Sequence, residues 1–176
     1  MGLNYNSSVN FPGDIQTAIL EANPGFDPYY RDNELKFQVP GQTYWTCTRT
    51  INVPKKMLKH HQFIEFDGID TFADIFVNDI FVGHTENFFR LWRFDVTGVL
   101  HEGENTIQIK FTPSEAVAVE TAKKIPYPVP CSVYDITSPN RTLARKTQCH
   151  AGWDWGPCIT AIGVYNSLKI IQTNAA

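Results

Sequence analysis

The most chemically suggestive stretch of the sequence runs from Cys149 to Pro157 and places Asp154 between Trp153 and Trp155. Successive side chains of an extended strand point to opposite faces, so the two indoles would share one face and the carboxylate would lie alone on the other. With the tryptophans turned inward, the strand would present Asp154 outward on a rigid backbone. Such a carboxylate could bind a polar ligand or could only support the fold.

Hydrolysis of a glycosidic bond requires two carboxylates roughly 5–10 Å apart. No second acid in a comparable setting accompanies Asp154, and the nearest charged residues are Arg145 and Lys146. These cations would keep Asp154 ionised rather than make it a proton donor. An ionised carboxylate accepts hydrogen bonds and suits sugar hydroxyls. The alternative is an aspartate that pairs with Arg145 within the fold, and the residues alone favour this alternative.

Other chemistries have weaker signals. Cys149, His150 and Cys158 match no zinc-binding template, and a fourth ligand is missing from the pattern. We therefore expect no metal, no cofactor and free, buried cysteines. The sequence also lacks a Gly-x-Ser-x-Gly nucleophile motif and a glycine-rich phosphate loop. It predicts no active site that is complete within this chain, and hence no catalytic residue.

The composition is that of a single globular domain spanning residues 1–176, because 43% of the residues are hydrophobic and 19% are charged. A net charge of -3 indicates neither a nucleic acid nor an anionic membrane as a partner. No apolar run approaches the roughly 20 residues that span a bilayer, and the first residues do not resemble a signal peptide. The four cysteines form no C-x-x-C pair, which is typical of a reduced, cytoplasmic protein.

Hydrophobic periodicity predicts mostly strands. A short helix is expected over 15–22 with Asp14 as its N-cap, and an irregular aromatic loop is expected over 26–34. A second helix is expected over 115–124 with Ser114 as its cap. A surface excursion over 125–142 follows it, because Pro126, Pro128 and Pro130 exclude regular structure. Two-residue alternation predicts strands at 44–53, 63–66, 73–77, 80–83, 92–96, 106–111 and 164–171. Turn residues separate them: Asp67-Gly68 closes the second strand, Asn78-Asp79 joins the third to the fourth, and a turn at 103–105 precedes the sixth. This pattern favours an all-β, antiparallel β-sandwich with one or two short helices.

A series of motifs in this chain resembles the amino-terminal region of the glycoside hydrolase family 2 β-mannosidases. The resemblance extends from about residue 11 to about residue 170, and its most specific parts are the loop at 27–34 and the Trp-Asp-Trp-Gly-Pro element at 153–157. The other motifs occur in the same order at 12–17, Trp45 with Arg49-Thr50, 68–73, 77–79, 83–87, 93–96, 103–105 and Arg145-Lys146.

The resemblance implies a jelly-roll sandwich of the galactose-binding type, as the amino-terminal domain of a larger glycosidase. Immunoglobulin-like domains and a (β/α)₈ barrel follow this domain in the family, and the barrel carries both catalytic glutamates. The isolated chain is therefore expected to be inactive. By the same resemblance, Asp154 would accept hydrogen bonds from the hydroxyls of a terminal β-mannoside. Trp153 and Trp155 would pack behind it or line the pocket wall, which reverses the preference reached from the residues alone.

The beginning of the chain departs from the family. A tryptophan-containing strand usually precedes the Pro-Gly element at 12–13, whereas residues 1–10 are short of apolar side chains. We therefore expect an abbreviated first strand at the edge of the sandwich. Two functions of other classes stay open beside the β-mannosidase domain. One is a free-standing carbohydrate-binding module, indicated by the aromatic content, and the other is a scaffold domain that never meets substrate.

Overall fold

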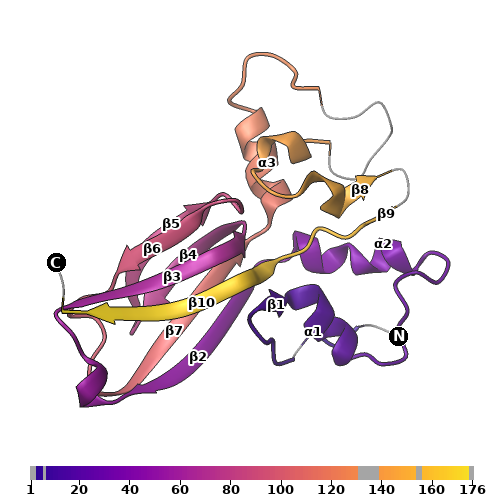
Figure 1. Ribbon diagram of the computed structural model, residues 1–176. Coiled ribbons are helices and arrows are strands. Elements are labelled where there is room, and N and C mark those ends of the chain that lie inside the picture. Colours follow the sequence, from indigo (N-terminus) through magenta and orange to yellow (C-terminus); the bar gives the residue numbers. More distant parts are fainter. Residues whose placement is uncertain (1–2, 6, 131–138, 154–155, 175–176) are drawn as a thin grey trace.

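The structure is a computed structural model that describes residues 3–5, 7–130, 139–153 and 156–174. Two four-stranded antiparallel sheets pack face to face, which confirms the all-β sandwich with a few short helices (Figure 1). The first sheet has the order β1 (Gly13–Asp14), β10 (Gly163–Thr173), β3 (His61–Asp70) and β6 (Leu91–Asp95). The second has the order β2 (Trp45–Val53), β7 (Gly103–Thr112), β4 (Phe72–Val77) and β5 (Ile80–Glu86).

Most of the remaining elements gather at the end of the sandwich opposite the end of β10, whereas the 3-10 helix Lys55–Met57 lies near the end of β10 (Figure 1). They include a two-stranded ribbon, which carries the aromatic-acid motif. Its strands are β8 (Ala151–Trp153) and β9 (Gly156–Cys158), and the α-helices are α1 (Ile15–Glu21), α2 (Asn33–Phe37) and α3 (Ser114–Ala122). Short 3-10 helices occupy Val39–Gln42, Lys55–Met57, Arg141–Leu143 and Gln148–His150. No helix in the described part of the chain is long and apolar enough to cross a membrane.

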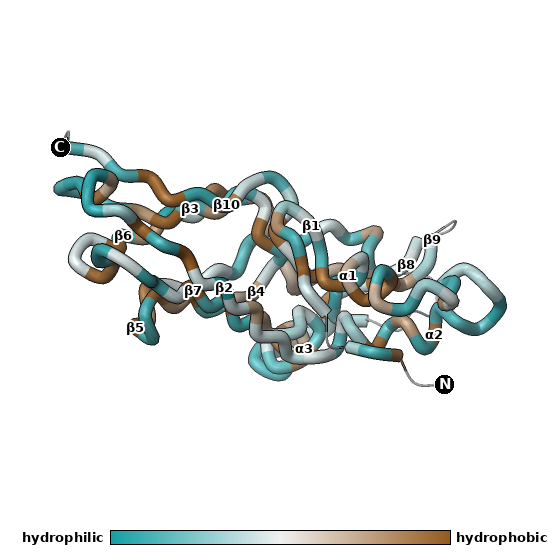
Figure 2. The backbone as a smooth tube through the Cα atoms, turned by 90° about the horizontal axis from the view of Figure 1, so that it is seen from below, coloured by the Kyte–Doolittle hydropathy of each residue, from teal (hydrophilic) through white to brown (hydrophobic). Residues whose placement is uncertain are grey.

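The core lies between the two sheets, which Figure 2 shows as separate layers. Every second residue of β7 is buried from Asn105 to Phe111, as expected for a strand with one face on the core. Phe66 of β3 is fully buried and packs edge-on against Phe94 of β6, with ring centroids 6.3 Å apart. Burial of each such side chain stabilises the fold by about 1.5–3 kcal/mol. Alternating apolar residues therefore account for the stability of the sandwich.

The β4–β5 hairpin has the predicted connection. Asn78 and Asp79 have positive φ angles of 51° and 62°, the conformation that a tight two-residue turn requires. Asn78 also donates hydrogen bonds to the Val99 carbonyl at 2.9 Å and to Asn105 Oδ1 at 2.8 Å. Its own Oδ1 accepts from the Thr106 amide at 2.9 Å. The turn thus joins the hairpin to the neighbouring loop and strand.

The first helix is confirmed, whereas the cap of the last helix was wrongly predicted. Asp14 accepts a hydrogen bond from the Thr17 amide at 2.7 Å and so caps α1. In α3, Ser114 is already the first helical residue, and Pro113 takes the cap position without a side-chain hydrogen bond. The buried hydroxyl of Ser114 therefore lies one residue too late to act as a cap. The aromatic loop is also shorter than expected, because α2 begins at Asn33.

Two glycines that indicated turns lie within strands instead. The strand predicted to close at Asp67-Gly68 continues as β3 to Asp70. Gly68 has a φ angle of 73°, and the pairing register with β10 shifts between Val164 and Ser167, so a bulge absorbs the irregularity. Gly103 similarly begins β7. The extension of β3 brings Asp70 to the end of the sandwich where the ribbon lies.

The amino-terminal edge is short, in agreement with the expected abbreviated strand. Among the described residues before α1, only Gly13 and Asp14 pair with β10. An open groove of about 650 Å³ lies beside this edge, between β2 and β10. Core residues Ile107, Ile109 and Leu168 line its floor.

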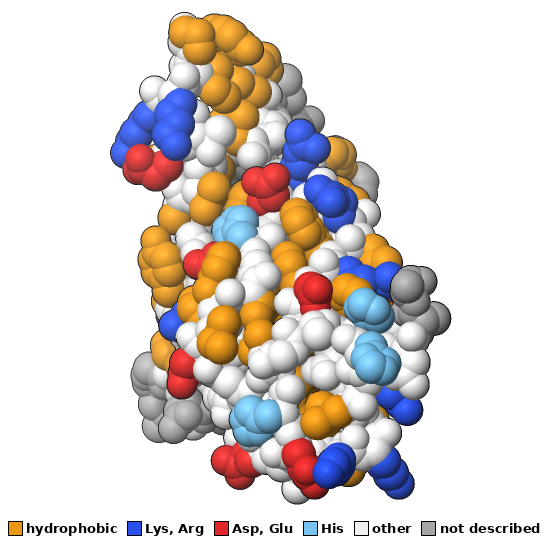
Figure 3. Space-filling view, turned by 90° about the vertical axis from the view of Figure 1, so that its left-hand side faces the viewer, with side chains coloured by type: hydrophobic (Ala, Val, Ile, Leu, Met, Phe, Trp, Pro, Cys, Tyr) orange, Lys and Arg blue, Asp and Glu red, His pale blue; other side chains and the backbone are white. Residues whose placement is uncertain are grey.

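The surface in Figure 3 mixes charges of both signs with histidines and apolar side chains. No single charge dominates this face, which agrees with the small net charge of -3. The charge distribution of the surface shown therefore does not favour a strongly charged partner.

Candidate functional site

The ribbon carries the aromatic-acid motif at an exposed end of the molecule. Trp153 is the last residue of β8, pairs with Gly156 of β9 and is 47% exposed. It therefore does not turn into the core. Asp154 and Trp155 lie outside the described residues, so their predicted contacts stay predictions. The continuous strand expected through the motif is replaced by two strands of three residues each.

Arg141 supports β8 from the 3-10 helix Arg141–Leu143. Its Nη1 donates to the carbonyls of Gly152 at 2.7 Å and Ala151 at 3.3 Å. The guanidinium carbon lies 5.7 Å from the centroid of the Trp153 ring, within the range of a cation–π contact. Gly152 adopts a φ angle of 91°, which a side chain would strain. Arg141 thus holds both the backbone and the indole of the ribbon, a role that its position in the sequence did not indicate.

Glu34 joins the ribbon to the aromatic loop. Its Oε1 accepts a hydrogen bond of 2.7 Å from the Cys158 amide, 124 residues away in the chain. The loop itself is ordered around Asp27, which accepts from the Tyr29 amide and from the side chain of Asn33. The two most specific motifs of the sequence therefore meet at one end of the fold. Figure 1 shows this arrangement, with α2 beside β9.

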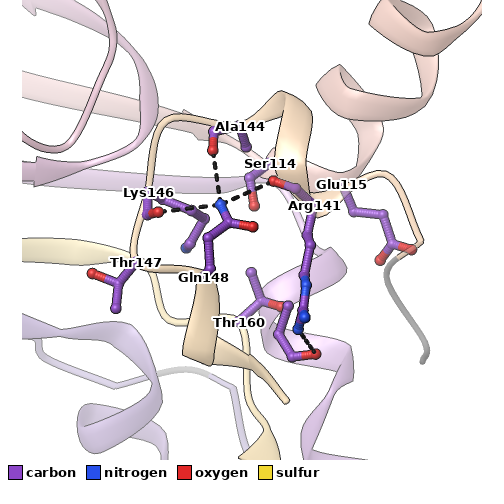
Figure 4. Close-up of a pocket in the computed structure, with 9 residues that line it drawn as sticks. Ser114, Glu115, Arg141, Ala144, Lys146, Thr147, Gln148 and Thr160 are labelled. Atoms are coloured by element: carbon purple, nitrogen blue, oxygen red, sulfur yellow. Dashed lines mark hydrogen bonds between the residues drawn. The ribbon is translucent and has the colours of Figure 1, made fainter. Parts of the chain in front are cut away.

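Gln148 fastens the loop that leads into the ribbon (Figure 4). Its Nε2 donates to the carbonyls of Arg141, Ala144 and Lys146 at 3.1–3.3 Å. The cavity enclosed behind this loop measures about 10 Å³, enough for one water molecule at most. A sugar ring therefore does not fit in this cavity, whereas Trp153 at the end of β8 is exposed.

A buried ion pair lies at the base of the same loop. Lys146 Nζ is 3.1 Å from Asp70 Oδ2, and the two side chains are 5% and 0% exposed. His150 Nδ1 lies 3.6 Å from the same oxygen, and Thr71 donates its hydroxyl hydrogen to the other one. Lys146 also donates to the Ala161 carbonyl at 2.8 Å. The carboxylate at the end of β3 thus contacts the loop at two positions.

The electrostatics of the pair follow from its burial. Burial raises the pKa of Asp70, but the nearby His150 ring, the Lys146 charge and the Thr71 hydrogen bond outweigh it and leave the pKa lowered. Burial lowers the pKa of Lys146, and the Asp70 charge offsets this effect only in part. Asp70 is therefore ionised at neutral pH, with a cation held against it.

Sequence reasoning considered Arg145 as the partner of an aspartate and missed this pair. Arg145 is exposed, and its carbonyl accepts from the Phe88 amide at 2.9 Å. The adjacent Lys146 turns inward to Asp70 instead. Nothing in the local pattern around Asp70 indicated a partner 76 positions further along the chain, because the contact depends on the unexpected length of β3.

The cysteines differ from one another in exposure. Cys47 and Cys149 are free thiols. Burial raises the pKa of Cys47 to about 11, so this thiol is inert. Cys149 is exposed, which corrects the expectation that it would be buried. Within the part of the chain that the structure describes, no group of three or more His, Cys, Asp or Glu side chains could hold a metal ion.

Comparison with known proteins identifies the relatives of this fold. The family model of the glycosyl hydrolase 2 galactose-binding domain-like domain matches residues 4–166. The β-mannosidase of Rattus norvegicus is 29% identical over 98% of this chain, and β-mannosidase A of Emericella nidulans is 33% identical over 97%. The chain covers only 20% and 18% of these two relatives. The crystal structure of a β-D-mannosidase from Dictyoglomus thermophilum is 33% identical, with a TM-score of 0.87 over 94% of this chain and 20% of its own.

Proposed function

Because the chain belongs to the glycosyl hydrolase 2 galactose-binding domain-like family, we propose that it serves as the non-catalytic amino-terminal domain of a β-mannosidase. The complete enzyme would remove terminal, non-reducing β-D-mannose residues. The chain spans about a fifth of the length of the relatives it matches. In this proposal the catalytic carboxylates lie in the remainder of the enzyme. The contact between Glu34 and the Cys158 amide carries this proposal, because it joins the two most specific β-mannosidase motifs into one surface.

The substrate-contacting part of this surface is the ribbon. Asp154 accepts hydrogen bonds from the hydroxyls of the terminal mannose, while Trp153 and Trp155 line the wall of the pocket. Three observations support this assignment: the exposure of Trp153, its support by Arg141, and the absence of room for a sugar behind the loop. Hydrogen bonds to a charged acceptor stabilise a complex by about 1.5–3 kcal/mol each.

The same end of the molecule packs against the catalytic (β/α)₈ barrel, with immunoglobulin-like domains between them in the chain. Large apolar side chains are unusually exposed around α2, beside the ribbon, and exposed apolar groups in one region mark interaction surfaces. These side chains are Tyr29, Tyr30, Leu35 and Val39. The free thiols of Cys47 and Cys149 favour a reducing compartment, which supports a cytoplasmic enzyme.

The first test separates the domain from the enzyme. The isolated chain, incubated with a chromogenic β-mannoside, should give no turnover, and clear hydrolysis would contradict the division of labour. In the full-length protein, Asp154→Ala should lower kcat/KM by about 10-fold or more, the loss of one charged hydrogen bond. Met57→Ala, a change at an exposed residue of the 3-10 helix between β2 and β3, is the matched control. Unchanged kinetics of a folded Asp154→Ala enzyme would remove this residue from the site.

A second test addresses the binding-module alternative. Titration of the isolated chain with mannose and with mannan, followed by calorimetry, should give no measurable heat of binding if the pocket needs the barrel. Millimolar or tighter binding would favour a free-standing carbohydrate-binding module.

A further inference from the structure

The buried carboxylate at the end of β3 contacts both ends of a five-residue segment, 146–150, that immediately precedes β8. We propose that Asp70 is a positioning residue: through Lys146 and His150 it sets the position from which the β8–β9 ribbon projects. The consequence for sugar binding rests on the proposed function, whereas the effect on the ribbon does not. No part of the assigned site includes Asp70.

The geometry places both ends of segment 146–150 against one carboxylate. Asp70 Oδ2 faces Lys146 Nζ at 3.1 Å and His150 Nδ1 at 3.6 Å, so the two ends of the segment are held from one side. Lys146 Nζ donates in addition to the carbonyl of Ala161, between β9 and β10. The start of β8 and the segment that follows β9 are therefore both anchored to Asp70 of the sandwich, directly or through Lys146.

His150 is enclosed by two elements of the sandwich. Asp70 faces it from β3, and the ring of Tyr165 from β10 lies with its centroid 6.4 Å away. Phe88 packs edge-on against Tyr165, with ring centroids 5.6 Å apart. His150 is the residue before Ala151, so its place among these groups determines where β8 begins.

The side chain of Asp70 is not needed to form the sheet. Its backbone pairs with Gly163 of β10, and this pairing is independent of the carboxylate. A buried ion pair also adds little net stability to a fold, because the cost of desolvating the two charges opposes their attraction. An ion pair does impose geometry, since each charge must meet its partner. We therefore expect loss of Asp70 to act on the ribbon and not on the whole fold.

Hydrogen exchange of the 176-residue chain, followed by mass spectrometry, tests this expectation. Asp70→Asn should accelerate exchange of the amides at 148–153 and 156–159 by about 10-fold or more, while amides of β3 and β7 keep their rates. Asp74→Asn is the matched control, because Asp74 also contacts a histidine, at 2.6 Å, but with its side chain 46% exposed. This control should leave the ribbon unchanged.

Equal acceleration across the whole chain, or no acceleration in the ribbon, would overturn the proposal. If Asp70→Asn does not fold, His150→Gln removes one of the two contacts without leaving a buried charge unpaired. It should accelerate exchange at the same amides by a smaller factor. Unchanged exchange in a folded His150→Gln chain would overturn the proposal as well.

Kinetics of the full-length protein separate the two proposals. Asp70→Asn should lower kcat/KM for a β-mannoside by about 10-fold or more, because small displacements of a binding group are costly, and the loss should appear mainly in KM. In a Trp153→Ala background the same substitution should have a smaller effect, since both act through the ribbon. A mobile ribbon with unchanged kinetics would contradict the substrate-contacting role but leave the positioning role intact.

Discussion

The sandwich and the ribbon end of this molecule are held together by different forces. In the sandwich, apolar side chains on alternate strand positions face one another across two sheets. At the ribbon end, individual polar side chains bind backbone groups of other segments or a buried charge. Arg141, Gln148, Glu34 and Lys146 are the principal contacts of this kind. Packing is redundant over many residues, whereas each polar contact is specific, so the two regions should respond differently to substitution.

The largest effect is expected from the sandwich. Phe66→Ala removes a fully buried ring and should lower the free energy of unfolding by about 3–5 kcal/mol. Chemical denaturation of the isolated chain measures this change. Phe81→Ala, which truncates an exposed ring of β5, is the control and should cost much less. If the two substitutions were equally costly, the core would not dominate stability as the comparison requires.

The ribbon end should open locally when its charge pair is broken. Lys146→Met leaves the buried Asp70 carboxylate without its lysine, and removal of one member of such a pair costs about 3 kcal/mol or more. Because the loop can open to solvent, we expect the substitution to lower mainly the free energy of local opening at amides 148–153. The midpoint of global unfolding should change less. Addition of Asp70→Asn should recover part of the loss. If only the midpoint of global unfolding fell, the ribbon end would not open independently of the sandwich, and the two regions would not differ as proposed.

Acid should weaken the ribbon end selectively. The pKa of Asp70 is lowered in the folded chain, so its contribution is present above the ordinary carboxyl value of 3.8 and is lost as pH falls through the lower, folded value. The difference in ribbon exchange between the wild-type chain and Asp70→Asn should therefore shrink below pH 3.8. Exchange measured at several pH values, corrected for the intrinsic rate, gives this profile. A constant difference down to the lowest pH would contradict ionisation of Asp70.

The smallest effect is expected at α1, which lies between the two regions. Asp14→Ala removes the N-cap hydrogen bond to Thr17 and should lower the free energy of unfolding by about 1 kcal/mol. Asp14→Asn keeps an acceptor at the cap and should cost less. Thermal unfolding of both variants gives the comparison. Equal losses in the two variants would show that the charge, and not the hydrogen bond, stabilises this helix.

Sequence-based prediction was more accurate for the sandwich than for the ribbon end. The strands around Val77 and Ile107 were predictable, because alternation along a strand is a local property and the Asn78-Asp79 turn has its own signature. The extension of β3 past Gly68 was not, since a glycine that suggests a turn was absorbed by a bulge that depends on β10. The cap of α3 failed by one residue because Pro113 already occupies the position.

At the candidate site, the motif that contains Trp153 was found from residue types alone, and its family followed from the order of motifs. The contacts that support the motif were not found. Arg141 is unremarkable in its sequence context, and the choice of Lys146 over Arg145 as the buried cation is a matter of which side chain faces inward. Neighbouring basic residues have the same local chemistry, so only their orientation in the fold distinguishes them.

The amino-acid sequence alone thus determined the sandwich, the family and the stretch that presents Trp153. Periodic apolar residues and short motifs carry this information locally. Only the tertiary structure decided that Glu34 meets Cys158, and that Asp70 lies beneath the segment leading into the ribbon. The physical reason is that a hydrogen bond or ion pair forms over about 3 Å of space, whatever the separation of its partners in the chain.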